Sequence, residues 1–248
     1  MTMDLTATQI AWTALIVLAA FVVRGLSGFG SSLIAMPLLV YVMPIRVAVP
    51  LMGLLAFIML CFMLARDWHA VIWREVWLML IPTLAGVAAG VLLFASLDNT
   101  LLLKCLGGVT LAYAIYALAV HYCGLPVVQC SERWAIPAGF GGSFIDTMFG
   151  GGGGTVVVVY MHMRRIGKVA FRATAGMLWF FEMTARVTGY AIAGFYTADV
   201  LRVAAWLLPV MWLGLWCGER IQSRISQETF SQVVALMLIA SGLTLLLK

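Results

Sequence analysis

Four ionisable residues lie inside long hydrophobic stretches of the sequence. They are Arg24, Asp146, Glu182 and Arg186. A charge at membrane depth costs at least about 2.5–3.5 kcal/mol, so each side chain needs an opposite charge, a water-filled cavity or a ligand. Glu182 and Arg186 are four residues apart and would share one face of a helix, where they can pair. The chemistry indicated is charge pairing, or the binding of a small ion, in an apolar environment.

Glycine clusters follow two of these residues. Segment 28–37 reads GFGSSLIAMP and segment 150–159 reads GGGGGTVVVV, and the two align without a gap at an offset of 122 residues. Arg24 and Asp146 are equivalent at this offset, each four residues before the first glycine. Glycine lets a helix break and lets a ligand approach the backbone. The half-helix after each break would direct free amides and a positive dipole end at the gap, which suits an anion.

The candidate substrate-binding residues are the glycines of both breaks, the hydroxyl residues that follow them, and two arginines. They are Arg24, Gly28, Gly30, Ser31, Ser32, Gly150, Gly152, Gly153, Gly154, Thr155 and Arg186. The arginines would supply positive charge, and the hydroxyls would cap the half-helices or donate to a ligand oxygen. Asp146 and Glu182 would couple a proton or hold an arginine in place. Two purely structural ion pairs, Arg24–Asp146 and Glu182–Arg186, remain the alternative.

The composition places these residues in a membrane protein. Of the 248 residues, 64% are hydrophobic and 10% are charged, whereas soluble domains are about half apolar and a quarter charged. The net charge of +5 comes from basic residues scattered between apolar blocks, which does not indicate a nucleic-acid binder. The five cysteines form no C-x-x-C motif and no cluster with histidine, so we expect no metal site, no cofactor and no enzymatic activity.

Eight hydrophobic blocks must position the candidate site. Their approximate bounds are 8–43, 46–65, 76–96, 100–120, 134–163, 173–194, 202–218 and 230–247. At about 1.5 Å per residue, block 8–43 would be about 54 Å long as one helix, beyond a hydrocarbon core of about 30 Å. We therefore predict an all-α, polytopic membrane protein of about eight transmembrane segments. Blocks 8–43 and 134–163 should be broken or re-entrant at their glycine clusters.

The blocks repeat in two sets of four. The match continues from IRVAVP (45–50) to GKVAFR (167–172), and Gly86-x3-Gly90 resembles Gly214-x3-Gly218 at an offset about six residues larger. We interpret these spaced glycines as helix-packing contacts. The chain therefore divides into a first membrane repeat (1–122), a linker loop (123–133) and a second membrane repeat (134–248).

The distribution of charge predicts an orientation if every block crosses the membrane once. One side then collects Arg46, Lys104, Arg164, Arg165, Lys168, Arg172, Arg220 and Arg224, and the other collects Arg66, Arg74, Arg133, Arg202 and Lys248. The positive-inside rule puts the larger set in the cytoplasm and both termini outside. Matched basic loops on one side favour parallel repeats. Inverted repeats remain open if the glycine breaks are re-entrant hairpins.

Internal repeats with broken helices are typical of secondary transporters, whose sites lie between the repeats. We predict a secondary transporter of a small anion that works by alternating access, with a coupling proton or sodium ion. An anion channel is one alternative, and a membrane subunit or assembly factor without transport activity of its own is another. We expect a multi-pass protein of the bacterial inner membrane that contacts the lipid bilayer, binds no nucleic acid and forms a homodimer.

The sequence resembles the TauE/SafE sulfite-exporter family of small-anion permeases. The resemblance lies in RGLSGFGSSLIAMPLL (24–39), FGGGGGTVVVVYM (149–161) and GKVAFRATAG (167–176). It extends over nearly the whole chain through the duplicated four-helix organisation. The resemblance implies an exporter of sulfite or of an organosulfonate such as sulfoacetate.

Overall fold

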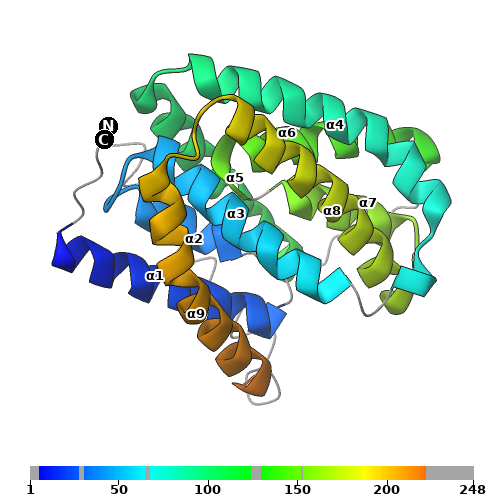
Figure 1. Cartoon of the computed structure of the whole chain (residues 1–248). Helices are drawn as coiled ribbons and strands as arrows, with labels where there is room; N and C mark the ends of the chain where they lie inside the picture. Colours follow the sequence, from blue (N-terminus) through cyan, green and yellow to red (C-terminus); the bar gives the residue numbers. More distant parts are fainter. Residues whose placement is uncertain (1–5, 28–30, 65–67, 124–129, 152, 222–248) are drawn as a thin grey trace. The chain divides into compact units, whose positions relative to one another are not determined.

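The computed structural model describes residues 6–27, 31–64, 68–123, 130–151 and 153–221 (Figure 1). The helices are α1 (Ala7–Ser27), α2 (Ser31–Leu39), α3 (Ile45–Leu64), η1 (Trp68–Ala70), α4 (Trp73–Ser96), α5 (Asn99–Cys123), η2 (Glu132–Trp134), α6 (Ala135–Phe149), α7 (Gly154–Met163), α8 (Lys168–Ile192) and α9 (Ala198–Ile221). No strand occurs in the described ranges, which confirms the predicted all-α class there. The last predicted block, 230–247, lies outside them.

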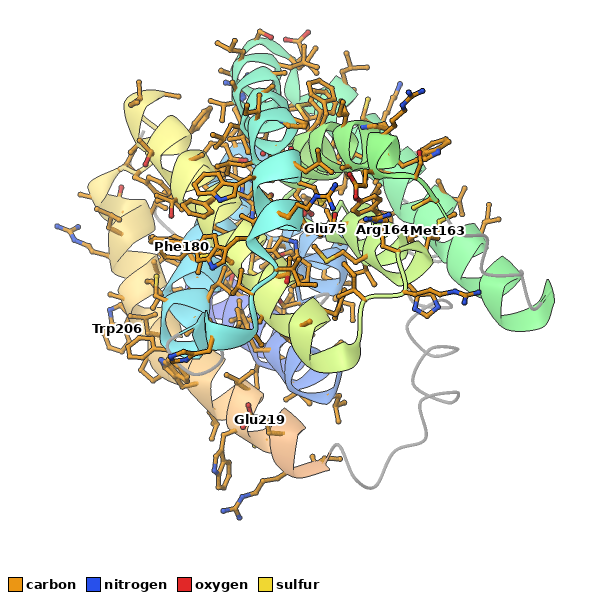
Figure 2. The ribbon with its side chains drawn as sticks, turned by 90° about the vertical axis from the view of Figure 1, so that its right-hand side faces the viewer. Glu75, Met163, Arg164, Phe180, Trp206 and Glu219 are labelled. Atoms are coloured by element: carbon orange, nitrogen blue, oxygen red, sulfur yellow. The ribbon has the colours of Figure 1, made fainter. Side chains whose placement is uncertain are left out.

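Four helical stretches of the described chain are long and apolar enough to cross a membrane. They are Thr8–Leu26, Ile45–Phe62, Trp73–Ser96 and Ala198–Ile221. Large apolar side chains point outward from the helices: Trp206 on α9 (Figure 2) is 80% exposed, and Ile81 on α4 is 77% exposed. Such surfaces suit contact with lipid. Together with the composition, they indicate a multi-pass integral membrane protein.

The described helices pack as two compact units. The first unit (1–51, 98–125 and 196–248) contains α1, α2, α5 and α9, and the second (52–97 and 126–195) contains α4, α6, α7, α8 and most of α3. Each unit therefore takes helices from both halves of the chain. The division into repeats 1–122 and 134–248 concerns similarity in sequence, and it stays a prediction.

In the first unit, α9 packs against α1 through glycine (Figure 1). A Cβ atom on Gly214 would lie 2.7 Å from the carbonyl oxygen of Leu18, and one on Gly25 would lie 2.6 Å from that of Leu215. Both distances are too short for a real side chain. Glycine thus lets the two backbones touch, and this contact supplies the van der Waals attraction that holds helices together in lipid.

In the second unit, α4 packs against α6 in the same manner. Gly86 faces the carbonyl oxygen of Phe140, and a Cβ atom on Gly90 would lie 2.8 Å from Cβ of Thr147. No larger residue fits either position without moving α6. The interpretation of both spaced glycine pairs as helix-packing contacts is therefore confirmed.

The second glycine break turns the chain back on itself. α6 ends at Phe149, α7 begins at Gly154, and the backbone N–H of Cys130 donates to the carbonyl oxygen of Met163 at 3.4 Å. The start of α6 and the end of α7 therefore lie together. The 15 residues of α6 span about 22 Å, less than the thickness of a hydrocarbon core. Block 134–163 is thus a hairpin of two short helices, broken at its glycine cluster as predicted.

The first break has a related geometry inside its own unit. α1 ends at Ser27 and α2 begins at Ser31, and residues 28–30 lie outside the described ranges. Gln9, near the start of α1, donates from Nε2 to the carbonyl oxygen of Val42, just after α2, at 3.4 Å. The two ends of the α1–α2 segment are therefore neighbours, as in a hairpin.

The assumption that every block crosses once is wrong for block 134–163. It placed Arg74 and Arg164 on opposite sides of the membrane. Both bind Glu132 instead: Nη2 of Arg74 lies 2.9 Å from Oε2, and Nη2 of Arg164 lies 3.1 Å from Oε1. A hydrophobic block of this length is compatible with a tilted crossing or a hairpin, so the sequence could not decide between them.

Glu75 of α4 holds the base of the α6–α7 hairpin (Figure 2). Glu75 is only 5% exposed. The Tyr160 hydroxyl donates to Oε2 at 2.7 Å, and Nε and Nη2 of Arg164 donate to Oε1 at 3.2 and 2.9 Å. The hydrogen bond to Glu75 raises the pKa of the Arg164 guanidinium, so this side chain stays charged. A buried carboxylate with three donors is well satisfied.

We expect Glu75→Ala to destabilise the hairpin strongly. It removes the buried acceptor of the Tyr160 hydroxyl and of Arg164, which keeps its pair with Glu132, and a buried donor left unsatisfied costs about 1–3 kcal/mol. Arg74→Ala is the matched control, because its pair with Glu132 is exposed (77% and 36% for the two side chains) and such pairs are worth less than about 1 kcal/mol. Thermal unfolding in detergent measures the stability of both variants. Equal losses of stability would contradict the role of Glu75 in holding the hairpin.

Candidate functional site

The second break is capped by its own residues. Gly150 adopts a left-handed conformation (φ 75°), and its N–H donates to the carbonyl oxygen of Asp146 at 2.8 Å, which ends α6. The N–H of Gly153 donates to Oδ1 of Asp146 at 2.9 Å. Asp146 is 7% exposed. Its carboxylate thus lies at the N-terminus of α7, where a negative charge is stabilised. Asp146 therefore serves both half-helices.

Two side chains of α8 bind the carbonyl end of α6. Nη1 of Arg186 donates to the carbonyl oxygen of Asp146 at 2.6 Å, and the Tyr190 hydroxyl donates to that of Thr147. A positive charge is favourable at a helix C-terminus, and Arg186 is 1% exposed. Its Nη1 also lies 3.8 Å from Oε1 of Glu182. The Glu182–Arg186 pair predicted from the spacing is therefore present.

Two further residues on this face of α8, Trp179 and Tyr190, were not among those predicted from the sequence. A Cβ atom on Gly154 would lie 3.5 Å from Oδ2 of Asp146 and 3.5 Å from the indole nitrogen of Trp179. The side chains around the break come from positions 179, 182, 186 and 190 of α8. These positions recur every three or four residues, so one helix face carries them all. That periodicity was the signal available for Trp179 and Tyr190.

The first break carries a positive charge in place of the carboxylate. Arg24 lies in the last turn of α1, and its Nη1 donates to Oγ of Ser31, the first residue of α2, at 3.2 Å. Ser31 and Ser32 are 0% and 8% exposed. The structure thus brings three predicted residues together at the N-terminus of α2. Gly28, Gly30 and Gly152 lie outside the described residues, as does the side chain of Thr155.

The two breaks therefore differ in charge although their residues align. The N-terminus of α7 holds the Asp146 carboxylate, whereas the N-terminus of α2 holds the Arg24 guanidinium. Glu182 and Arg186 align with Leu60 and Leu64 at the offset of 122 residues, so α3 offers no equivalent charges. Arg24 and Asp146 belong to different units, and an ion pair between them stays a prediction.

Comparison with known families adds a match over most of the chain. A family model described as Sulfite exporter TauE/SafE matches residues 13–245. It confirms the resemblance inferred from the two glycine motifs. No curated protein and no solved structure matches the chain.

Proposed function

The chain belongs to the sulfite exporter TauE/SafE family, and we propose that it is a secondary transporter that exports a small oxyanion such as sulfite or an organosulfonate. The family is one of membrane transporters, which agrees with the predicted non-enzymatic role. The finer assignments of substrate, site and transport cycle rest on the charges at the two breaks. We place the protein in the bacterial inner membrane.

The observation that carries the proposal is the position of Arg24. Its guanidinium lies 3.2 Å from Ser31 at the N-terminus of α2, which is the positive end of a helix dipole. A cation there is disfavoured by the helix. An oxyanion held between the guanidinium and the amides at the start of α2 would be attracted by both, with the buried hydroxyls of Ser31 and Ser32 as further donors.

Arg186 is the weaker candidate for contact with substrate. It is 1% exposed, and its Nη1 donates to a backbone carbonyl oxygen of α6 and approaches Glu182. The amide of Gly153 in turn donates to Asp146. The second break therefore contains its own anion at the helix N-terminus, whereas the first supplies a cation there. We assign the substrate anion to the first break.

Glycine contacts support two repeats related in structure. Gly86 faces Phe140 of α6, and Gly214 faces Leu18 of α1. The offset of 122 residues makes Leu18 equivalent to Phe140, and the larger offset of 128 residues makes Gly86 equivalent to Gly214. Each unit thus uses the same contact, between the hairpin of one repeat and the third block of the other. Such an exchange favours two mixed bodies as the moving parts of alternating access.

The hairpins also favour inverted repeats. With each broken block returning to its own side and every other block crossing once, the two hairpins open on opposite sides of the membrane. One side then collects nine basic loop residues, and the other collects four, Arg46, Lys104, Arg202 and Lys248. This bias is larger than that of eight single crossings. The positive-inside rule assigns the nine to the cytoplasm.

A ligand screen tests the proposed function. Purified protein is heated with sulfite, sulfate, thiosulfate, sulfoacetate, taurine or simple carboxylates, and uptake of the stabilising anion into vesicles is then measured. We expect sulfite or a sulfonate to raise Tm, because an anion at 100 times its Kd adds about 2.7 kcal/mol to the free energy of unfolding. We also expect the uptake rate to saturate as the anion concentration rises. Flux that rises without saturation would indicate a channel. An absence of stabilisation by every anion would indicate a subunit without transport activity.

A further inference from the structure

Glu182 has no role in the anion site proposed above, although it is one of the most deeply buried acidic residues described. It is 2% exposed. Its Oε1 atom accepts no hydrogen bond among the described residues, and Nη1 of Arg186 lies 3.8 Å away, beyond hydrogen-bond distance. An ionised carboxylate so placed lacks the donors that stabilise its charge in an apolar environment.

Arg186 lies next to two acidic residues in this part of the second unit: its Nη1 contacts the main-chain carbonyl of Asp146 and approaches the carboxylate of Glu182. Asp146 comes from α6, Arg186 and the hydroxyl of Tyr190 come from α8, and α7 contributes the amide of Gly153. Neither α4 from Thr83 to Ser96 nor α3 from residue 52 to 62 contains Asp, Glu, His, Lys or Arg. The cluster would carry a net negative charge with every group ionised. Burial disfavours that state, and one bound proton removes it.

The hydrogen bonds indicate which carboxylate takes the proton. Asp146 accepts the N–H of Gly153 at the N-terminus of α7, and both the hydrogen bond and the dipole favour its ionised form. No comparable donor serves Oε1 of Glu182. Resting on the transport function proposed above, we propose that Glu182 is the proton-binding group of this transporter and that Arg186 transmits its protonation state to the α6–α7 hairpin.

Arg186 can transmit the change because its Nη1 lies between two acceptors. It is 2.6 Å from the carbonyl oxygen of Asp146 and 3.8 Å from Oε1 of Glu182. With Glu182 protonated, Arg186 keeps its hydrogen bond to the carbonyl oxygen of Asp146, which also accepts the N–H of Gly150 at the end of α6. Loss of the proton creates a carboxylate that competes for the same nitrogen through a stronger, charge-assisted hydrogen bond. The carbonyl end of α6 then loses a donor, and the hairpin tip is biased toward a second arrangement.

Glu182→Gln tests the proposal because it keeps the shape of a protonated carboxyl and cannot release a proton. In vesicles, the wild type should change its accumulation of labelled sulfite about tenfold per pH unit of gradient if one proton moves per anion. The variant should retain sulfite exchange without a gradient and lose the response to pH. Glu219→Gln, at an exposed position of α9, is the matched control and should behave as the wild type.

The outcomes separate this inference from the transport function. Wild-type protein that transports sulfite without responding to a pH gradient overturns the inference and leaves the function intact. If the wild type transports no anion, the proposed function fails, and infrared titration of substrate-free protein decides on Glu182. We expect a protonated carboxyl band in the wild type that is missing from Glu182→Gln and present in Glu219→Gln. A band that is absent from the wild type, or unchanged in Glu182→Gln, overturns the inference.

Discussion

Arg24→Ala abolishes saturable anion transport and leaves the protein folded and inserted in the membrane. The guanidinium lies beside Ser31 at the N-terminus of α2, where the positive end of the helix dipole repels it. An oxyanion bound there would be attracted both by the guanidinium and by the helix N-terminus. Truncating one partner of a buried, hydrogen-bonded charge pair costs about 2–5 kcal/mol, which weakens binding by about 30-fold or more. Concentration-dependent uptake into vesicles measures the loss, and normal transport by this variant would remove Arg24 from the site.

Two further variants sharpen this result. Arg24→Lys should restore transport poorly, because an ammonium group cannot reproduce the two parallel hydrogen bonds that a guanidinium makes to an oxyanion. Arg202→Ala is the matched control in the same unit, because Arg202 is exposed and pairs only loosely with Asp199, at 3.4 Å. It should transport at the wild-type rate.

A double variant separates ligand binding from ion pairing between the two units. If Arg24 and Asp146 only paired with each other, each single alanine variant would leave a buried, uncompensated charge and lose stability. Arg24→Ala/Asp146→Ala would then regain both stability and transport. We expect the double variant to remain inactive at every substrate concentration. Transport at the wild-type rate would end the ligand role of Arg24.

Gly153→Ala collapses the α6–α7 hairpin. A Cβ atom on Gly153 would collide with the carbonyl oxygen of Gly142 and lie 2.9 Å from the amide of Asp146. Both contacts are with backbone, so no side chain can move aside to make room. The backbone conformation of Gly153 itself suits any residue (φ −71°). A loss of stability in the variant would therefore come from the collision of the added Cβ atom with the α6 backbone alone. We expect a loss of more than about 4 kcal/mol, or a failure to fold.

Gly141→Ala is the control for this second prediction. Gly141 lies in α6, next to Gly142, and a Cβ atom there would meet nothing within 4 Å. Alanine in a helix interior is favoured over glycine by about 0.5–1 kcal/mol, so this variant should be neutral or slightly stabilised. Thermal unfolding of both variants in detergent checks the pair. A Gly153→Ala protein as stable as Gly141→Ala would contradict the tight hairpin.

Local features of the sequence were sufficient for the membrane class, the break and one ion pair. A run of apolar residues long enough to span lipid is visible without any tertiary contact. The break after Phe149 follows from glycine, because Gly150 takes a left-handed conformation that other residues avoid. Glu182 and Arg186 meet because four residues bring side chains together on one helix. Each of these features depends on neighbours in the chain.

The tertiary structure alone decided where each half-helix goes and which groups cap it. Hydrophobicity is the same for a segment that crosses and for one that returns, so the sequence could not show that Arg164 reaches Glu75 and Glu132. The carbonyl end of α6 is bound by Arg186, 40 residues farther along the chain. Such partners depend on how separate helices pack, and no local pattern encodes that packing. The alignment made Arg24 and Asp146 equivalent, but only their contacts showed that one break holds a cation and the other an anion at its helix N-terminus.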